Sequence, residues 1–350
     1  MTLSALVAWR CLLVLGLGMV VGTVTGCLGF HRGAIEGEPR DASFVEVAGA
    51  RLRIEDSGGE GPPVLLIHGF ASSLDAWKTV VPALVDRHRV IAVDLKGFGW
   101  SDRPAGDYSP RAQAAMLLEL LDQLKVERVA LVAHSWGSSV ALALALQAPE
   151  RVTRIALYDA WVYEEQLPTT FLMARASGVG ETLFGLYYRE RPEDKVALAF
   201  YDERFVTQEL VDTINDQLDR PGTTAAALAA VRGQRFSEMQ AMYRKIEQPV
   251  LLLWGREDRV TLLEFGERLS LELPNAKLAV YPQCGHFPMI EAKNPSNRDL
   301  RAFLEADLVG PPALPPVAVP APPPPTPVPE PEIPEPARGD EADPENPFAP

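Results

Sequence analysis

The sequence predicts an α/β protein with a mostly parallel central sheet and helices on both faces. Short apolar runs alternate with segments of helical period along most of the chain. Most of these runs are apolar and do not alternate with polar residues, which is typical of strands buried on both faces of a parallel sheet. The expected strands are residues 43–47, 51–56, 63–67, 89–94, 128–132, 154–159, 250–254 and 277–281.

The helical segments predict a cap above the sheet. Helices are expected at 74–85, 110–124, 138–146, 262–273 and 295–307, between or after the strands. After the sixth strand the alternation stops, and residues 161–248 contain only helical patterns, the first at 164–176. An insertion that leaves the carboxyl ends of parallel strands lies over the ligand crevice there. We therefore expect residues 161–248 to form a helical cap on a body that spans 43–308.

The N-terminus has the layout of an export signal. Arg10 precedes twenty uncharged, mostly apolar residues, 11–30, and Val24-Thr25-Gly26-Cys27 resembles the lipobox of bacterial lipoprotein signals. This predicts a signal peptide over 1–26, a lipid on Cys27 and a polar tether over 27–42. The alternative is an uncleaved anchor, because twenty helical residues span about 30 Å. Both readings place a membrane-tethered body in the cell envelope, outside the cytoplasm.

The remaining composition excludes several kinds of partner. Residues 309–350 are rich in proline and acids, so they cannot form a core and are expected to be a disordered tail. The net charge of −14 argues against nucleic-acid binding. Only one of the three cysteines, Cys284, lies in the body, and no Cys/His cluster suits a metal. We expect neither a metal nor a cofactor.

A candidate nucleophile lies in the sequence Ala133-His134-Ser135-Trp136-Gly137. This stretch follows an apolar strand and precedes a helix, and its small residues allow a sharp turn around Ser135. Such a turn presents a serine hydroxyl at the carboxyl end of the sheet and at a helix N-terminus, where free N–H groups favour a developing oxyanion.

A serine needs a base, and the base needs a carboxylate. Of five histidines, His286 is the one expected at the carboxyl end of the last strand, within reach of Ser135. Asp258 follows the seventh strand and is expected to orient the imidazole. Asp159, at the end of the sixth strand, is the alternative. The backbone N–H groups of Trp136 and Phe70 are expected to form the oxyanion hole.

Together these motifs resemble the α/β-hydrolase family. The resemblance rests on His68-Gly69-Phe70, the turn at 94–102, the elbow at 133–137, residues 254–258 and Gly285-His286, in this order over residues 43–307. It implies the α/β-hydrolase fold with a helical cap after the sixth main strand. Capped dehalogenases and epoxide hydrolases of the family use Asp where this chain has Ser135, so the resemblance implies acyl transfer.

The cap is rich in aromatic residues, which favours a small or medium apolar, ester-like substrate. Two alternatives use the same triad: hydrolysis of a C–C bond and aminopeptidase-like hydrolysis. A third alternative is a non-catalytic binding protein of the envelope that keeps the fold.

Overall fold

The computed structural model describes residues 28–306, which contain an eight-stranded sheet. The strand order is β1-β2-β4-β3-β5-β6-β7-β8. The pairings β1–β2 and β2–β4 are antiparallel, and all the others are parallel, so the predicted mostly parallel sheet is confirmed. The strands are β1 (Ser43–Val47), β2 (Ala50–Asp56), β3 (Pro63–Ile67), β4 (Arg89–Val93), β5 (Val129–His134), β6 (Val152–Tyr158), β7 (Val250–Gly255) and β8 (Ala276–Tyr281).

The predicted signal peptide 1–26, the lipid site Cys27 and the predicted tail 309–350 lie outside the described residues. Within residues 28–306, no helix has both the length and the apolar character needed to cross a bilayer. The export signal, the lipid and the tail therefore stay predictions.

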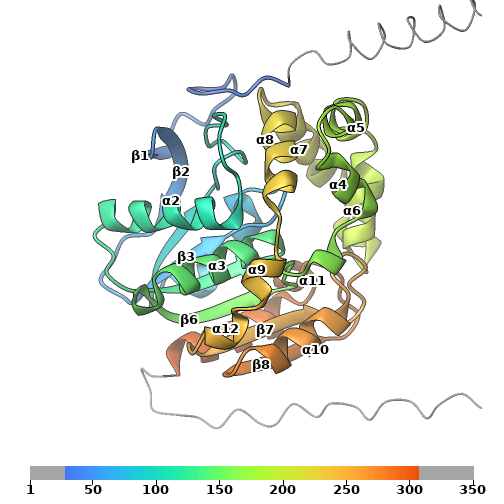
Figure 1. Cartoon of the computed structure of the whole chain (residues 1–350). Coiled ribbons are helices and arrows are strands. Elements are labelled where there is room, and N and C mark those ends of the chain that lie inside the picture. The colour runs from blue at the N-terminus through green and yellow to red at the C-terminus, as the bar shows by residue number, and fades with distance from the viewer. Residues whose placement is uncertain (1–27, 307–350) are drawn as a thin grey trace, which may run out of the picture. The chain divides into compact units, whose positions relative to one another are not determined.

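Helices cover both faces of the sheet (Figure 1). Along β3, Leu65 and Ile67 pack into one apolar cluster, whereas Val64 and Leu66 pack into another on the opposite face. Alternate residues of a strand point to opposite faces, so a strand apolar at every position needs cover on both sides. The first cluster includes side chains of α2 (Pro110–Gln123), α3 (Trp136–Gln147) and α10 (Leu263–Glu272), and the second includes those of η1 (Leu74–Trp77) and α12 (Lys293–Glu305).

The predicted helix at 74–85 is wrong in detail. The structure has two short 3₁₀ turns there, η1 and η2 (Val81–Ala83). Pro82 lacks a backbone N–H and restricts its neighbour, so a continuous α-helix does not form. The last helix begins earlier than predicted, at Lys293, and follows the short α11 (Pro288–Glu291).

The residues between β6 and β7 are helical, with turns and no strand (Figure 1). The predicted first helix, 164–176, is interrupted at Pro168 for the reason that interrupts 74–85. Buried side chains of α4, α5 and α8, among them Phe184 and Leu228, form a separate apolar cluster. The elements are η4 (Glu164–Gln166), α4 (Thr169–Ala174), α5 (Val179–Tyr187), α6 (Pro192–Ala199), η5 (Glu203–Phe205), α7 (Gln208–Asp219), α8 (Thr223–Gly233), α9 (Ser237–Gln240) and η6 (Tyr243–Lys245).

Arg103 joins the body, the cap and the first described residues. Its buried guanidinium donates hydrogen bonds to the carbonyls of Gly99 (2.6 Å) and Ser101 (2.8 Å) and to Thr223 Oγ1 at the start of α8 (3.1 Å). Its backbone N–H and carbonyl pair with those of His31, at 2.8 and 2.9 Å. The described part of the predicted tether is therefore held against the body at this point.

We expect Arg103→Met to destabilise the protein by about 3 kcal/mol, because it removes three hydrogen bonds from a buried charged group. Urea unfolding followed by tryptophan fluorescence measures the change. Arg191→Met is the matched control, since the Arg191 side chain is 82% exposed and its effect should stay within about 0.5 kcal/mol. Equal effects of the two substitutions would contradict the role assigned to Arg103.

Candidate active site

Ser135 lies at the sharp turn between β5 and α3. Its backbone angles are φ 52° and ψ −126°, which residues other than glycine rarely adopt. Its N–H donates to the carbonyl of Tyr158 (2.9 Å), and its carbonyl accepts from Trp161 N (3.0 Å) and Ser138 N (2.9 Å). Bonds to β6, to the start of the cap and to α3 thus hold Ser135 in this strained conformation.

Two glycines allow the loop after β3 to approach this turn. A Cβ atom on Gly137 would lie 2.3 Å from the carbonyl oxygen of His68, and one on Gly69 would lie 2.9 Å from the Cβ of Ser135. Both distances are shorter than real Cβ contacts, so neither position accepts a larger residue without backbone movement. The close approach brings the backbone of Phe70 beside the start of α3.

His286 and Asp258 form a buried hydrogen-bonded pair. His286 Nδ1 donates to Asp258 Oδ2 at 2.7 Å, which leaves Nε2 as the unprotonated nitrogen of the neutral imidazole. Asp258 also accepts from Val260 N (2.7 Å), Thr261 N (3.0 Å) and Thr261 Oγ1 (2.7 Å). Burial opposes ionisation of Asp258, but attraction to His286 and these hydrogen bonds outweigh it and lower its pKa. The predicted acid and base therefore lie together, with the acid in its charged form.

Asp159 lies beside this pair in a different environment. It is fully buried, and only its Oδ1 accepts a hydrogen bond, from Gly255 N at 2.9 Å, whereas its Oδ2 has no partner among the described residues. Burial, followed by the negative charge of Asp258, raises the pKa of Asp159 well above its usual value. Burial and the nearby negative charge thus disfavour the ionised form of Asp159, which is the form that orients an imidazolium.

His134 supports the position of His286, a role that the sequence did not indicate. The Nε2–H of His134 donates to the carbonyl of His286 at 2.8 Å, and the two ring centroids lie 4.7 Å apart. Burial, and then the proximity of His286, lower the pKa of His134 well below its usual value. A neutral His134 thus fastens the loop after β8 to the end of β5, where the Ser135 turn begins.

The predicted oxyanion donors lie at the two segments that the glycines bring together. Trp136 is the first residue of α3, where backbone N–H groups have no partner within the helix. Phe70 N donates no hydrogen bond to any of the described residues. Their side chains are also close, with ring centroids 6.4 Å apart. Two N–H groups near Ser135 are thus available to an oxyanion.

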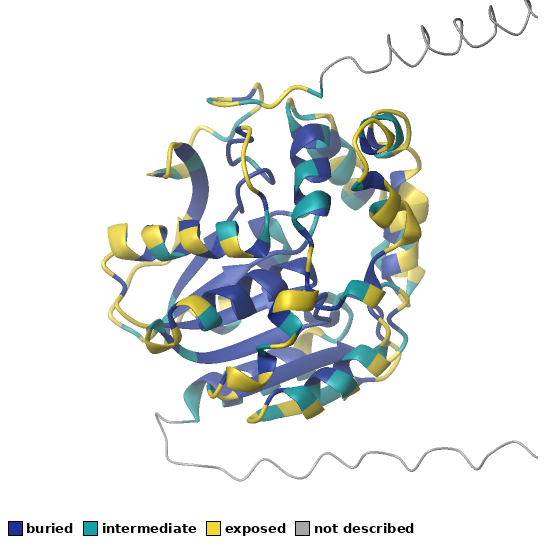
Figure 2. Ribbon diagram, in the orientation of Figure 1, coloured by how far each residue is buried: buried dark blue, intermediate teal, exposed yellow. Residues whose placement is uncertain are grey.

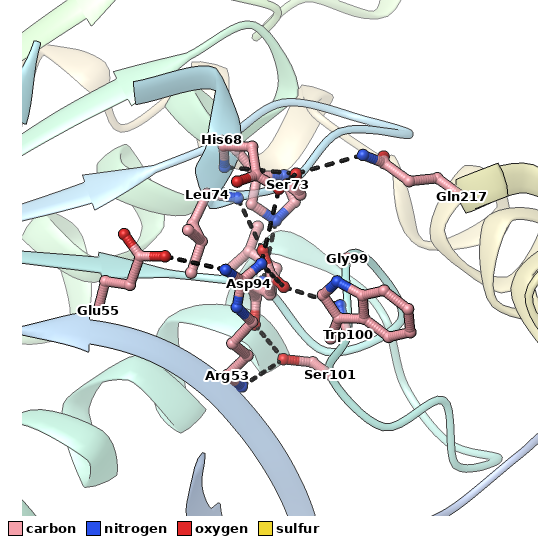
Figure 3. Close-up of polar contacts among 12 residues, drawn as sticks. Arg53, Glu55, His68, Ser73, Leu74, Asp94, Gly99, Trp100, Ser101 and Gln217 are labelled. Atoms are coloured by element: carbon pink, nitrogen blue, oxygen red, sulfur yellow. Dashed lines mark hydrogen bonds and ion pairs between the residues drawn. The ribbon is translucent and has the colours of Figure 1, made fainter. Parts of the chain in front are cut away.

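Buried Asp94 organises the loops around these donors (Figure 3). Its Oδ1 accepts from Leu74 N at 2.7 Å, and its Oδ2 accepts from Trp100 N at 2.8 Å. A Cβ atom on Gly99, at φ +52°, would lie 2.1 Å from the Asp94 carboxylate, so the turn closes tightly around it. Burial raises the pKa of Asp94 to about 6. The carboxylate thus fixes the turn that contains Phe98. The Phe98 ring contacts the rings of Phe70 and Trp136.

Aromatic side chains surround the space near the donors. Phe70 lies at the centre, with Phe98, Phe171 and Tyr188 at ring-centroid distances of 5.6, 5.4 and 6.3 Å. Phe171 and Tyr188 come from the cap, so body and cap share this wall. Ser135 and His286 are each only 4% exposed. The described wall is thus mainly apolar.

Neither Cys284 nor a metal offers an alternative reaction centre here. Cys284 is fully buried, and burial raises the pKa of its thiol, so it is not a nucleophile. Asp159, Asp258 and His286 each present one potential ligand atom, all within 4.8 Å of one another. Four hydrogen bonds already occupy the oxygens of Asp258, however, and one of them comes from His286 Nδ1. This arrangement suits an acid–base pair better than a metal site.

The two acids make opposite predictions. Asp258→Asn should lower kcat/KM by about 10³- to 10⁴-fold, because an amide cannot stabilise the imidazolium or fix its tautomer. Asp159→Asn should keep activity within about threefold, because the amide oxygen can still accept from Gly255 N and burial already disfavours a charge at this position. The rate of p-nitrophenyl ester hydrolysis at pH 7.5 measures both. The reverse ranking would assign the acid role to Asp159.

Comparisons with known proteins agree with this geometry. Residues 62–293 match the family described as having the alpha/beta hydrolase fold. The chain is 32% identical over 276 residues to the 2-hydroxy-6-oxo-2,4-heptadienoate hydrolase of Pseudomonas putida, covering 75% of this chain and 96% of that protein.

Solved structures of similar proteins include two hydrolases. A mutant of the meta-cleavage product hydrolase of Pseudomonas fluorescens IP01 has a TM-score of 0.65 at 27% identity, over 76% of this chain and 98% of that one. A thermophilic esterase from Thermogutta terrifontis has a TM-score of 0.65 at 25% identity, over the same shares of the two chains. This protein therefore belongs to the α/β-hydrolase family, as its motifs predicted, and it is a hydrolase.

Proposed function

We propose that the protein is a serine hydrolase that transfers acyl groups to water through Ser135, His286 and Asp258. The observation that carries the proposal is the 2.7 Å hydrogen bond between His286 Nδ1 and the ionised Asp258, which His134 links to the strained turn at Ser135. A binding protein has no need for either feature, whereas nucleophilic catalysis needs both.

The reaction runs in two acyl-transfer steps. His286 Nε2 takes the proton of Ser135 Oγ as the oxygen attacks the substrate carbonyl, and the N–H groups of Phe70 and Trp136 bind the resulting oxyanion. His286 then gives the proton to the leaving alcohol, and an acyl-serine ester remains. Water attacks that ester with His286 again as the base, which releases the carboxylic acid and restores Ser135.

The aromatic wall supports a small or medium apolar ester as the substrate. Phe70, Phe171 and Tyr188 form a cluster of apolar rings that suits an acyl chain, and the hydroxyl of Tyr188 is buried without a partner among the described residues. A buried unpartnered hydroxyl favours a ligand with at least one polar atom, such as an ester oxygen.

The relatives support a second candidate, hydrolysis of a C–C bond in a meta-cleavage product. Proteins named as hydrolases of this type are 32% identical to the chain over most of its body. The same triad serves such a reaction if the acyl group passes to Ser135 and the leaving group departs as a carbon. That carbon must receive a proton before water releases the acyl group from Ser135.

The two candidates make different predictions for substrate preference. The ester proposal predicts that p-nitrophenyl butyrate has a higher kcat/KM than 2-hydroxy-6-oxo-2,4-heptadienoate, both followed by absorbance. Ser135→Ala should lose at least about 10⁴-fold in either reaction and should not react with a fluorophosphonate probe. A preference for the dienoate would favour the second candidate. Unchanged activity of Ser135→Ala would contradict both candidate functions, because both use Ser135 as the nucleophile.

We further propose that a lipid on Cys27 tethers the protein in the cell envelope. The apolar stretch over 11–30 and the lipobox-like residues before Cys27 support this proposal. Metabolic labelling with an alkyne fatty acid should mark the wild type and not Cys27→Ser, because only the cysteine thiol accepts the lipid. Labelling that persists in Cys27→Ser would contradict it.

A further inference from the structure

The cap carries a group of exposed apolar side chains, which we call the cap patch: Leu172, Met173, Val179, Leu186 and Tyr187. They are between 42% and 62% exposed. Leu172 and Met173 belong to α4, the others belong to α5, and these helices contact each other. Val179 and Leu186 lie two turns apart in α5 and therefore share one side of it. Figure 2 shows exposed residues along the outer surface of this part of the cap.

The first described residue, Leu28, lies at the same helices. Its side chain packs against the cluster that contains Ala174 of α4, Phe184 of α5 and Leu228 of α8. A groove of about 560 Å³ continues from it, with Phe30 and Tyr108 among its lining. Cys27 precedes Leu28 by one residue, and consecutive Cα atoms are about 3.8 Å apart. A lipid on Cys27, or an apolar anchor that ends there, would therefore place the bilayer surface at α5 and α8.

From this placement we propose that the cap patch docks into the lipid bilayer to which the N-terminus is tethered, and that substrates enter the site from that bilayer. The proposal rests on the proposed tether and on the proposed hydrolysis, and it names their substrate class: apolar acyl compounds dissolved in the membrane. Segment 172–201 has equal numbers of acidic and basic residues. Apolar burial, and not charge, would therefore drive the docking.

The patch lies directly behind the wall of the active site. Leu172 is exposed, whereas its neighbour Phe171 contacts Phe70 in the aromatic wall; Tyr187 is exposed, whereas its neighbour Tyr188 contacts the same ring. The helices that would enter the bilayer thus belong to the same segment as the cap residues of the aromatic wall, Phe171 and Tyr188. A shift of α4 and α5 in the membrane would open the site towards lipid.

The test uses the full, lipidated protein in phosphatidylcholine–phosphatidylglycerol vesicles. An environment-sensitive fluorophore is attached to Leu186→Cys or, as the control, to Leu271→Cys, because Leu271 on α10 is 84% exposed. Cys284 is fully buried and should not react. The label at 186 should shift to shorter wavelength and be quenched by spin-labelled lipid, at low and high salt alike. The label at 271 should do neither.

A second arm compares substrates. The double variant Leu186→Asp/Tyr187→Asp should lose about tenfold in rate on an ester dissolved in the vesicles, because it removes apolar surface from the bilayer. Its rate on a soluble short-chain ester should not change. Leu271→Asp should alter neither rate.

The outcomes separate the proposals. Protein that does not float with the vesicles would refute the tether and the docking together. Protein that floats while the label at 186 stays unquenched would refute the docking alone. A blue-shifted label that lipid does not quench, in particles of twice the mass, would assign the patch to a second copy of the chain. Loss of activity on every substrate by Ser135→Ala remains a separate test of the hydrolase itself.

Discussion

The strained backbone of Ser135 is the constraint on which the rest of the site depends. A φ of 52° at a residue with a side chain persists only because hydrogen bonds from β6, α3 and the first residues of the cap surround it. The turn also requires close neighbours without side chains, which explains the glycines at 69 and 137. Ser135, the proposed nucleophile, is thus positioned by backbone hydrogen bonds to the sheet, to α3 and to the start of the cap.

The site also shows how hydrogen-bond donors decide the charge of a buried carboxyl. Asp258 accepts four hydrogen bonds and keeps its negative charge despite burial. Asp159 lies within 4.8 Å of it, accepts one hydrogen bond from the backbone, and has a raised pKa. Asp94 accepts two backbone N–H bonds and lies between these cases, with a pKa of about 6. The pKa of a buried aspartate therefore shifts in different directions within one protein, in step with the number of local donors.

The strands and the positions of their ends along the chain were predictable, because apolar runs and the residues after them are local features of the sequence. The proximity of Asp258 and His286 followed from the rule that parallel strands end at one edge. The contribution of His134 was not predictable, since it depends on the direction of a ring relative to a loop 152 residues away. The contact between Thr261 and Asp258 had a weak signal in the sequence. An aspartate often begins a turn, in which its carboxylate accepts from the N–H groups two and three residues later, as Asp258 does here. The broken helix at 74–85 could have been recognised from Pro82.

The edge position of β8 has a consequence for the folding of the enzyme. Among the described strands β8 pairs only with β7, and the loop that contains His286 follows it, so this proposed base is synthesised after every described strand of the sheet. Joining this loop to the turn at Ser135 closes a very long segment of chain, which is an entropically costly and late kind of contact. Hydrolytic competence should therefore appear at the end of folding and disappear first when β8 frays, well before the central strands separate. A chain that crosses a membrane unfolded would remain inert until its final strand docks.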